Sequence, residues 1–215
     1  MTGILITNPA HDDVTTYLFH WSREIKELAE AKFRSVKEFM QKDVTRSNIE
    51  SYIRKANPKF VIFHGHGNYD QICGFEKNEV LIKSGINDNH LSGKIIHSVT
   101  CNSAESLGPS AVKKGALAFV GFDDEFYFPY NPLLASKPMD DVTAACSMEP
   151  IMQFSRSIIK SNTVKEAYEK SQNVFVKWLE KCHSSDAPYE LEGVAPFISW
   201  NMNHQKVIGD NSAKL

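Results

Sequence analysis

The chain has 215 residues, of which 42% are hydrophobic and 23% are charged. These proportions are typical of an ordinary globular domain and exclude disordered, collagen-like and coiled-coil chains. The 24 basic and 26 acidic residues give a net charge of −2, so no basic surplus predicts a nucleic-acid partner. The length favours a single domain spanning residues 1–215.

Targeting signals and cysteine spacing predict the compartment. Residues 1–13 have neither the basic segment nor the apolar segment of a signal peptide, and no stretch approaches the ~18 apolar residues of a membrane span. We therefore expect a cytoplasmic protein without a membrane span. The cysteines form no CxxC pair and fit no disulfide framework, so we expect reduced thiols. There are four of them: Cys73, Cys101, Cys146 and Cys182.

Strands and helices alternate through the first part of the chain. Short runs rich in β-branched residues predict strands, and apolar residues at helical spacing predict helices between them. The expected strands are residues 3–7, 35–40, 60–63, 94–99 and 117–121, with a small hairpin over residues 72–82 around a polar centre at 76–79. The expected helices are residues 13–29 with Asp13 as N-cap, 47–56 opened by a capping box of Ser47 and Glu50, and 103–114.

The later part of the chain is predicted to be mainly helical. One helix covers residues 142–160 and is interrupted at Pro150, and a second covers 163–182, opened by a capping box of Thr163 and Glu166. Residues 195–200 are expected to form the last strand, with Val207 and Ile208 beside the C-terminus. Alternating strands and helices imply parallel pairing, so we predict an α/β three-layer sandwich with a mostly parallel sheet and helices on both faces.

Two polar turns follow predicted strands. Residues 64–68 read His-Gly-His-Gly-Asn, and residues 100–103 read Thr-Cys-Asn-Ser. Ligands of parallel α/β sheets bind at the carboxyl ends of the strands, and glycines on both sides of His66 permit a sharp turn and a close approach to a substrate. We expect a helix N-terminus and a nearby imidazole to lower the pKa of Cys101 and favour the thiolate. If the two strands are neighbours, His66 and Cys101 bracket a substrate as a Cys/His dyad requires.

These motifs resemble those of the caspase-like cysteine peptidases, the superfamily of metacaspases, separases, gingipains and bacterial CHAT-domain proteases. In that superfamily one strand ends in a Gly-His-Gly or Ser-His-Gly turn, and the next core strand ends in the catalytic cysteine. Residues 63–67 (Phe-His-Gly-His-Gly) match the first motif, and residues 99–104 (Val-Thr-Cys-Asn-Ser-Ala) match the second. Residues 115–121 are similar to the helix end and strand that follow in CHAT-like members.

The resemblance implies one CHAT-type peptidase domain, a cysteine endopeptidase that cleaves protein or peptide substrates without a cofactor or metal. It implies that Cys101 is the nucleophile, His66 the catalytic histidine, and the backbone N–H groups of Gly67 and Cys101 the oxyanion hole. Many relatives are latent until cleavage, an ion or a partner activates them, so an activating protein partner is expected. A mobile loop over residues 122–141 fits that expectation. The sequence identifies no residue that orients the imidazole.

Candidate substrate-binding residues follow several predicted strands. Relatives often place an acidic or amide residue two positions before the nucleophile, and this chain has Val99 there. The other candidates are Asp12, Asp13, Asp123, Asp124, Glu125 and Trp200. The five carboxylates among them favour Arg or Lys over an apolar residue at P1, and Trp200 is a candidate pocket wall. The same carboxylates also have a structural interpretation, as helix caps at Asp12 and Asp13 and as a solvated loop at residues 123–125.

Two alternative functions remain open. One is a zinc hydrolase in which His64 and His66 ligate the metal together with Cys73, His90 or Cys101, since imidazole and thiolate suit zinc. Otherwise His64 is expected to pack behind His66. The second alternative is a catalytically silent caspase-like domain that binds or signals, although such domains commonly lack one member of the His/Cys pair.

Overall fold

The computed structural model describes residues 3–76 and 79–215, within which a six-stranded sheet runs in the order β2-β1-β3-β7-β8-β9. The first five strands in this order are parallel, and β9 pairs antiparallel with β8 at one edge. The strands are β1 (Gly3–Asn8), β2 (Ser35–Met40), β3 (Phe60–His64), β7 (Ile95–Val99), β8 (Ala118–Phe122) and β9 (Gln205–Gly209). The predicted mostly parallel α/β sheet is confirmed.

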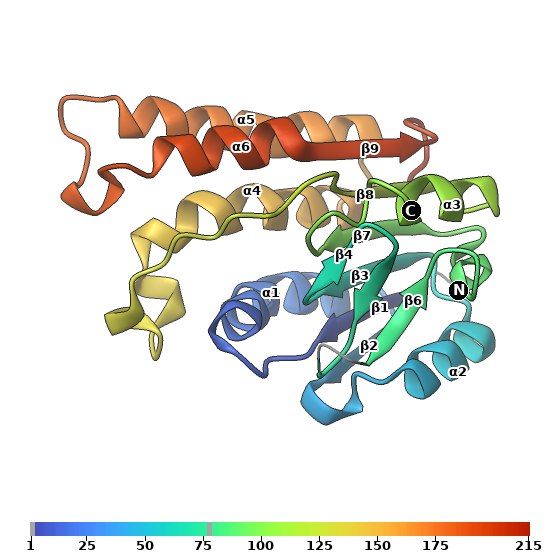
Figure 1. Ribbon diagram of the computed structural model, residues 1–215. Coiled ribbons are helices and arrows are strands. Elements are labelled where there is room, and N and C mark those ends of the chain that lie inside the picture. Colours follow the sequence, from blue (N-terminus) through green and yellow to red (C-terminus); the bar gives the residue numbers. More distant parts are fainter. Residues whose placement is uncertain (1–2, 77–78) are drawn as a thin grey trace.

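Helices cover both faces of this sheet. Because side chains alternate along a strand, Ile4 and Ile6 of β1 enter one hydrophobic core and Leu5 enters the other. Figure 1 shows α4 lying between α1 and the pair formed by α5 and α6. The first core contains α1 (Asp13–Lys32), α4 (Val142–Ile159), α5 (Val164–Cys182) and α6 (Ala195–His204), and the second contains α2 (Arg46–Ala56) and α3 (Leu107–Lys113).

A small antiparallel sheet follows β3 directly. It runs in the order β4-β5-β6, from β4 (Gly67–Asn68) through β5 (Gln71–Cys73) to β6 (Val80–Lys83). The predicted hairpin is therefore confirmed in β5 and β6, while two residues of its polar centre, Lys77 and Asn78, lie outside the described residues. The N–H of Cys73 donates to the carbonyl of His66 at 2.9 Å, so this sheet holds the histidine turn in place.

The helix starts agree with the sequence in one case and differ in another. Thr163 and Glu166 form the predicted capping box of α5. In α2, however, Thr45 is the N-cap, and the carboxylate of Glu50 accepts from Arg46 at 2.7 Å instead of reaching back to Ser47. The arginine supplies a charged donor one helical turn away, which is a stronger partner than a backbone N–H.

The predicted strand at residues 195–200 is wrong, because these residues begin α6. Pro196 lies in the first turn of this helix, where a missing N–H costs nothing. Ile198 and Asn201 face the core, whereas Phe197 and Trp200 remain 40% and 37% exposed. A short apolar run does not distinguish a strand from a helix by itself. The last strand is β9, which contains Val207 and Ile208.

The predicted interruption at Pro150 is also wrong, because α4 runs unbroken from Val142 to Ile159. Proline removes one hydrogen bond of the helix. Pro150 is buried where α4 packs against α5, and its carbonyl accepts the hydroxyl of Ser171 at 2.7 Å. Tertiary packing on both sides of α4 therefore outweighs the local preference.

Among the helices of the described residues, none is both long and apolar enough to cross a bilayer.

Candidate active site

The carboxyl ends of four neighbouring strands supply the candidate site. Asp12 follows β1, His66 follows β3, Cys101 follows β7, and the acidic residues 123–125 follow β8. In the parallel pairing of β3 with β7, His64 lies opposite Val99, so His66 and Cys101 each lie two residues past this pair. The sheet topology therefore brings the histidine turn and the cysteine turn to the same edge.

The glycines beside His66 allow the two turns to approach each other. Gly65 has a φ of +144°, a conformation that residues with a side chain rarely adopt. A Cβ atom at Gly67 would lie only 2.9 Å from both Cβ and Oγ1 of Thr100, the residue before the cysteine. Glycine at this position is required for the close contact between the ends of β3 and β7.

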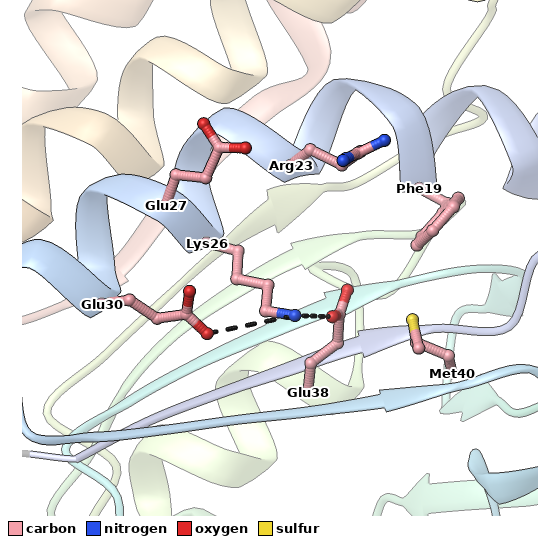
Figure 2. Close-up of a pocket in the computed structure, with 7 residues that line it drawn as sticks. All are labelled: Phe19, Arg23, Lys26, Glu27, Glu30, Glu38 and Met40. Carbon is pink, nitrogen blue, oxygen red and sulfur yellow. Dashed lines mark ion pairs between the residues drawn. The ribbon is translucent and has the colours of Figure 1, made fainter.

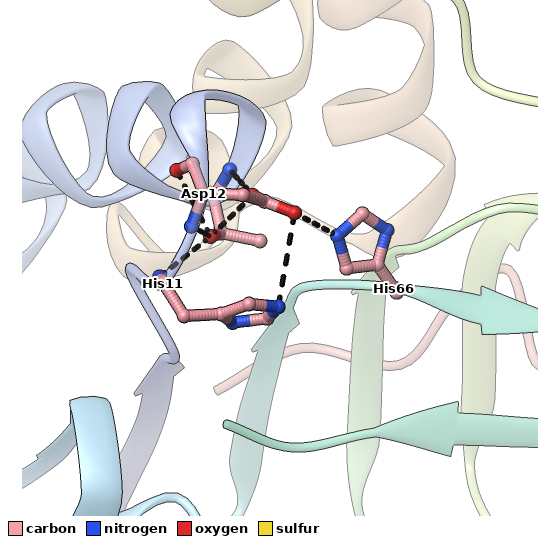
Figure 3. Close-up of polar contacts among 4 residues, drawn as sticks. His11, Asp12 and His66 are labelled. Atoms are coloured by element: carbon pink, nitrogen blue, oxygen red, sulfur yellow. Dashed lines mark hydrogen bonds and ion pairs between the residues drawn. The ribbon is translucent and has the colours of Figure 1, made fainter. Parts of the chain in front are cut away.

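The imidazole of His66 is held by a carboxylate. Its Nε2 lies 2.6 Å from Oδ2 of Asp12 (Figure 3). Asp12 is also the N-cap of α1, and its Oδ1 accepts from the backbone N–H and the hydroxyl of Thr15 at 2.9 and 2.7 Å. The N-cap is therefore Asp12 and not the predicted Asp13, and the capping interpretation of Asp12 is confirmed. In addition, its second carboxylate oxygen holds the imidazole of His66, a contact that the sequence does not predict.

The state of Asp12 fixes the state of His66. Burial raises the pKa of the Asp12 carboxyl, but hydrogen bonds from Thr15 and His66 outweigh this effect and hold the pKa at about 2. At neutral pH the carboxylate is ionised and only accepts, so Nε2 of His66 is the donor. In the neutral ring the lone pair then belongs to Nδ1. Nδ1 points away from Asp12 (Figure 3), and it can accept a proton.

Cys101 is partly exposed and lies in a tight turn, not at the start of a helix. Asn102 adopts a left-handed conformation with a φ of +58°. Its N–H donates to the carbonyl of Asp124 at 2.9 Å, and the N–H of Ala104 donates to the carbonyl of Phe122 at 2.9 Å. These bonds tie the segment to the end of β8. The predicted helix at residues 103–114 consequently begins only at Leu107.

The expectation of a lowered cysteine pKa is wrong. Burial raises the pKa of the Cys101 thiol, and the charges of Glu125 and Asp124 raise it further against a hydrogen bond from the backbone of Phe126. The helix N-terminus that would have favoured a thiolate lies farther along the chain. The resting side chain at neutral pH is therefore a thiol, and a base is needed to activate it.

The acidic candidates differ in their partners. Asp123 accepts from Nδ1 of His204 at 2.8 Å and lies 3.4 Å from Nζ of Lys206, and Asp13 accepts from the hydroxyl of Tyr130 at 3.0 Å. Asp124 and Glu125 are the carboxylates whose charge acts on the thiol. Of the predicted substrate-binding acids, these two are therefore the ones whose charge raises the pKa of the Cys101 thiol.

The two other substrate-binding candidates have different positions. Val99 is 1% exposed and packs in the hydrophobic core. The prediction that its side chain lines a substrate pocket is therefore wrong. Trp200 belongs to α6 and not to a strand end, but its indole N–H donates to the carbonyl of Glu125 at 3.0 Å. The indole therefore lies beside the acidic residues 123–125, where it is able to form a pocket wall.

The predicted zinc ligands do not come together. His64 is 1% exposed, and its Nδ1 lies 2.8 Å from Oδ1 of Asn8. His90 lies 4.0 Å from a carboxylate oxygen of Glu50 on the second helix of the chain. Within the part of the chain that the structure describes, the group of side chains close enough to hold a metal ion is His11, Asp12 and His66. His64 is therefore a buried packing residue, as expected for a histidine that ligates no metal.

A surface cavity of about 430 Å³ lies elsewhere, between α1 and the edge strand β2 (Figure 2). The amino group of Lys26 lies within it, 2.8 Å from a carboxylate oxygen of Glu38. The lining residues are Phe19, Arg23, Lys26, Glu27, Glu30, Glu38 and Met40, none of which is a predicted site residue. This cavity is therefore separate from the candidate active site.

No protein-family model and no curated protein sequence matches this chain. Solved structures do match its fold. Gingipain R, an Arg-specific cysteine proteinase, matches with a TM-score of 0.64 and 13% identity over 100% of this chain and 47% of that one. A complex of the pro- and mature domains of Porphyromonas gingivalis RgpB matches with a TM-score of 0.61 and 11% identity over 99% and 48%. A structure described as a protease matches with a TM-score of 0.62 and 10% identity over 99% and 48%.

The chain thus spans about half the length of the structures it matches. A likeness at this level of identity concerns the fold, and it leaves the single-domain assignment as a prediction. The predicted α/β sandwich is the fold of the caspase-like gingipain structures.

Proposed function

We propose that this protein is a cysteine endopeptidase in which Cys101 is the nucleophile, His66 the general base and acid, and Asp12 the residue that orients the imidazole. The observation that carries the proposal is the hydrogen bond of 2.6 Å from His66 to Asp12, at the same sheet edge as the cysteine. A nucleophile, a base and a third group that orients the base are the parts of a catalytic triad. The likeness of the fold to cysteine proteinases supports the proposal.

The reaction follows from the protonation states of these groups. Nδ1 of His66 accepts the thiol proton of Cys101, and the sulfur attacks the carbonyl carbon of the scissile peptide bond. The backbone N–H groups of Gly67 and Cys101 are proposed to stabilise the oxyanion. His66 then gives its proton to the leaving amine as the C–N bond breaks. Water, deprotonated by the same imidazole, hydrolyses the thioester and regenerates the thiol.

We propose a basic P1 residue for the substrate. Asp124 and Glu125 exert their charge on the sulfur of Cys101, so a cationic side chain bound beside the nucleophile would offset that charge. It would thereby lower the pKa of the thiol as the substrate binds. Trp200 is proposed as a wall of this pocket, since its indole is fixed to the backbone of Glu125.

The loop of residues 122–141, which includes the acidic residues 123–125, is also proposed as the segment that controls latency. Hydrogen bonds hold this loop to the rest of the domain at several points. The N–H and the carbonyl of Tyr127 bond the side-chain amide of Asn201, and Tyr17 donates to Asp141 at 2.8 Å. Release of such bonds by a partner would change the surroundings of the thiol. An activating protein partner therefore remains part of the proposal.

A peptidyl chloromethyl ketone with arginine at P1 tests the function. We expect stoichiometric alkylation of Cys101, located by mass spectrometry, and alkylation about 100-fold slower in His66→Ala because the base is missing. The same reagent with leucine at P1 should react more slowly. Cys182→Ala is the matched control, since Cys182 is another partly exposed cysteine but lies at the end of α5. It should label like the wild type.

The same experiment separates the peptidase from a catalytically silent domain. A silent domain would share the raised pKa of Cys101. Its accessible cysteines would react slowly and alike, with no dependence on His66 or on the P1 residue. That outcome would overturn the proposed function.

A further inference from the structure

Three side chains from the segment before α1 and from the histidine turn form a cluster with the chemistry of a metal site. One ligand atom from each of His11, Asp12 and His66 lies within 4.8 Å of those of the other two, and Figure 3 shows the three side chains together. Nε2 of His11 lies 3.7 Å from Oδ2 of Asp12, and Nε2 of His66 lies 2.6 Å from the same oxygen. The side chains are 17%, 33% and 24% exposed, in the order His11, Asp12, His66. Both ring nitrogens of His11 are buried, so an ion enters on the side of the more exposed Asp12 and His66.

The distances fit a small tetrahedral ion. Zinc holds nitrogen and oxygen ligands at about 2.0–2.2 Å, which places ligand atoms about 3.3 Å from one another. The pair of His66 and Asp12 must open slightly from 2.6 Å, and the pair of His11 and Asp12 must close slightly from 3.7 Å. Three protein ligands leave a fourth position for water.

The carboxylate is already oriented for this role. Its Oδ1 accepts from the backbone N–H and the hydroxyl of Thr15, and the N–H of His11 donates to the same hydroxyl at 3.0 Å. Thr15 therefore fixes the two residues that precede α1. Hydrogen bonds of this kind orient the ligands of metal sites and are worth about 10–100-fold in metal affinity.

The donor set selects the class of metal. Two imidazoles and one carboxylate suit Zn²⁺ and related transition metals, whereas Mg²⁺ and Ca²⁺ prefer oxygen ligands alone. The carboxylate supplies one negative charge against the two positive charges of the ion. From this geometry we propose that His11, Asp12 and His66 form an inhibitory Zn²⁺ site that removes the histidine from catalysis.

The inhibition follows from where the imidazole proton lies. In the metal-free site Nε2 of His66 donates to Asp12, and Nδ1 has the lone pair. Zinc takes the lone pair of Nε2, so the single proton of the neutral ring moves through solvent from Nε2 to Nδ1. A protonated Nδ1 does not accept the proton of Cys101. This consequence rests on the proposed function, whereas the metal site itself does not.

Calorimetric titration of metal-free Cys101→Ala with ZnCl₂ tests the site without any activity. The substitution removes the thiol as a rival ligand. We expect one Zn²⁺ per chain, with affinity at least about 10-fold lower when His11→Gln or His11→Ala is added. Adding His90→Ala instead should leave the affinity unchanged, and MgCl₂ or CaCl₂ should not compete. Absence of binding, or binding that does not depend on His11, would overturn the site.

Peptidase assays of the chain with intact Cys101 test the consequence. With saturating ZnCl₂ we expect the rate to fall about 10³-fold, the same loss that is expected when the general base is removed. His11→Gln, measured against its own metal-free rate, should require a higher zinc concentration for the same loss. Activation by zinc, or inhibition equally strong in His11→Gln, would overturn the inhibitory role. Zinc binding in a chain that cleaves no peptide would instead contradict the proposed function and leave the site intact.

Discussion

His66→Ala is expected to lower kcat/KM for peptide hydrolysis by about 10³-fold, which corresponds to about 4 kcal/mol of transition-state stabilisation. The substitution removes the group that takes the proton from Cys101 and returns it to the leaving amine. Because the pKa of the thiol is raised by burial and by Glu125 and Asp124, almost no thiolate forms without the base. The measurement is steady-state kinetics with a fluorogenic peptide that carries arginine at P1.

Two variants control this result. His90→Ala removes a histidine of similar exposure, 28% against 24% for His66, and should leave kcat/KM unchanged. Asp12→Asn should have an intermediate effect. Asparagine caps a helix about as well as aspartate, but it has no negative charge and no longer fixes the tautomer of the His66 imidazole. A His66→Ala variant that keeps wild-type kcat/KM would contradict the assigned role.

The free energy of unfolding is expected to fall by about 4 kcal/mol between pH 7.5 and pH 5. Burial lowers the pKa of His64 and of His97 to about 3, and the charge of His64 adds to the effect at His97. A histidine in the unfolded chain titrates near 6.5. Below that pH the unfolded state binds protons that the folded state does not, so stability present above pH 6.5 is lost as the pH falls toward 3. Urea denaturation at a series of pH values measures the loss.

Asparagine variants assign this pH dependence to individual residues. Nδ1 of His97 lies 2.8 Å from the hydroxyl of Ser155, and Nδ1 of His64 lies 2.8 Å from Asn8. An asparagine nitrogen occupies nearly the same place without titrating. Each of His64→Asn and His97→Asn should reduce the loss by about 2 kcal/mol. His183→Asn, at an exposed position after α5, should not alter it. An unchanged pH profile in both core variants would contradict the argument.

Local patterns in the sequence were sufficient for the parallel sheet and most helices. Buried strands such as β3 and β7 are short runs of β-branched and aromatic residues, and their order along the chain implies parallel pairing. The two turns share an edge because the carboxyl ends of neighbouring parallel strands lie at the same edge of a sheet. Ligands of parallel α/β sheets bind at this edge. Segments with a weaker pattern were mispredicted. Residues 195–200 are apolar but form a helix, and Pro150 lies inside an unbroken one.

The finer features of the site depend on contacts between distant segments. Asp12 reads locally as a helix cap, and its second role appears only because β1 is the neighbour of β3 and places the carboxylate beside His66. The raised pKa of Cys101 similarly depends on residues 124–126, which reach the sulfur through the order of β7 and β8. A sequence pattern does not contain these distances. Aspartate just after the strand that neighbours a histidine turn is the signal that would have identified the orienting residue.

A crystal structure of the adduct with an arginine-containing peptide aldehyde tests the central claim most directly. The account predicts a hemithioacetal carbon bonded to Sγ of Cys101, with Nδ1 of His66 within about 3 Å of the adduct and Nε2 still bonded to Asp12. The arginine side chain should lie toward Asp124 and Glu125. An adduct on another residue, or an imidazole separated from the hemithioacetal by packed side chains, would contradict the account.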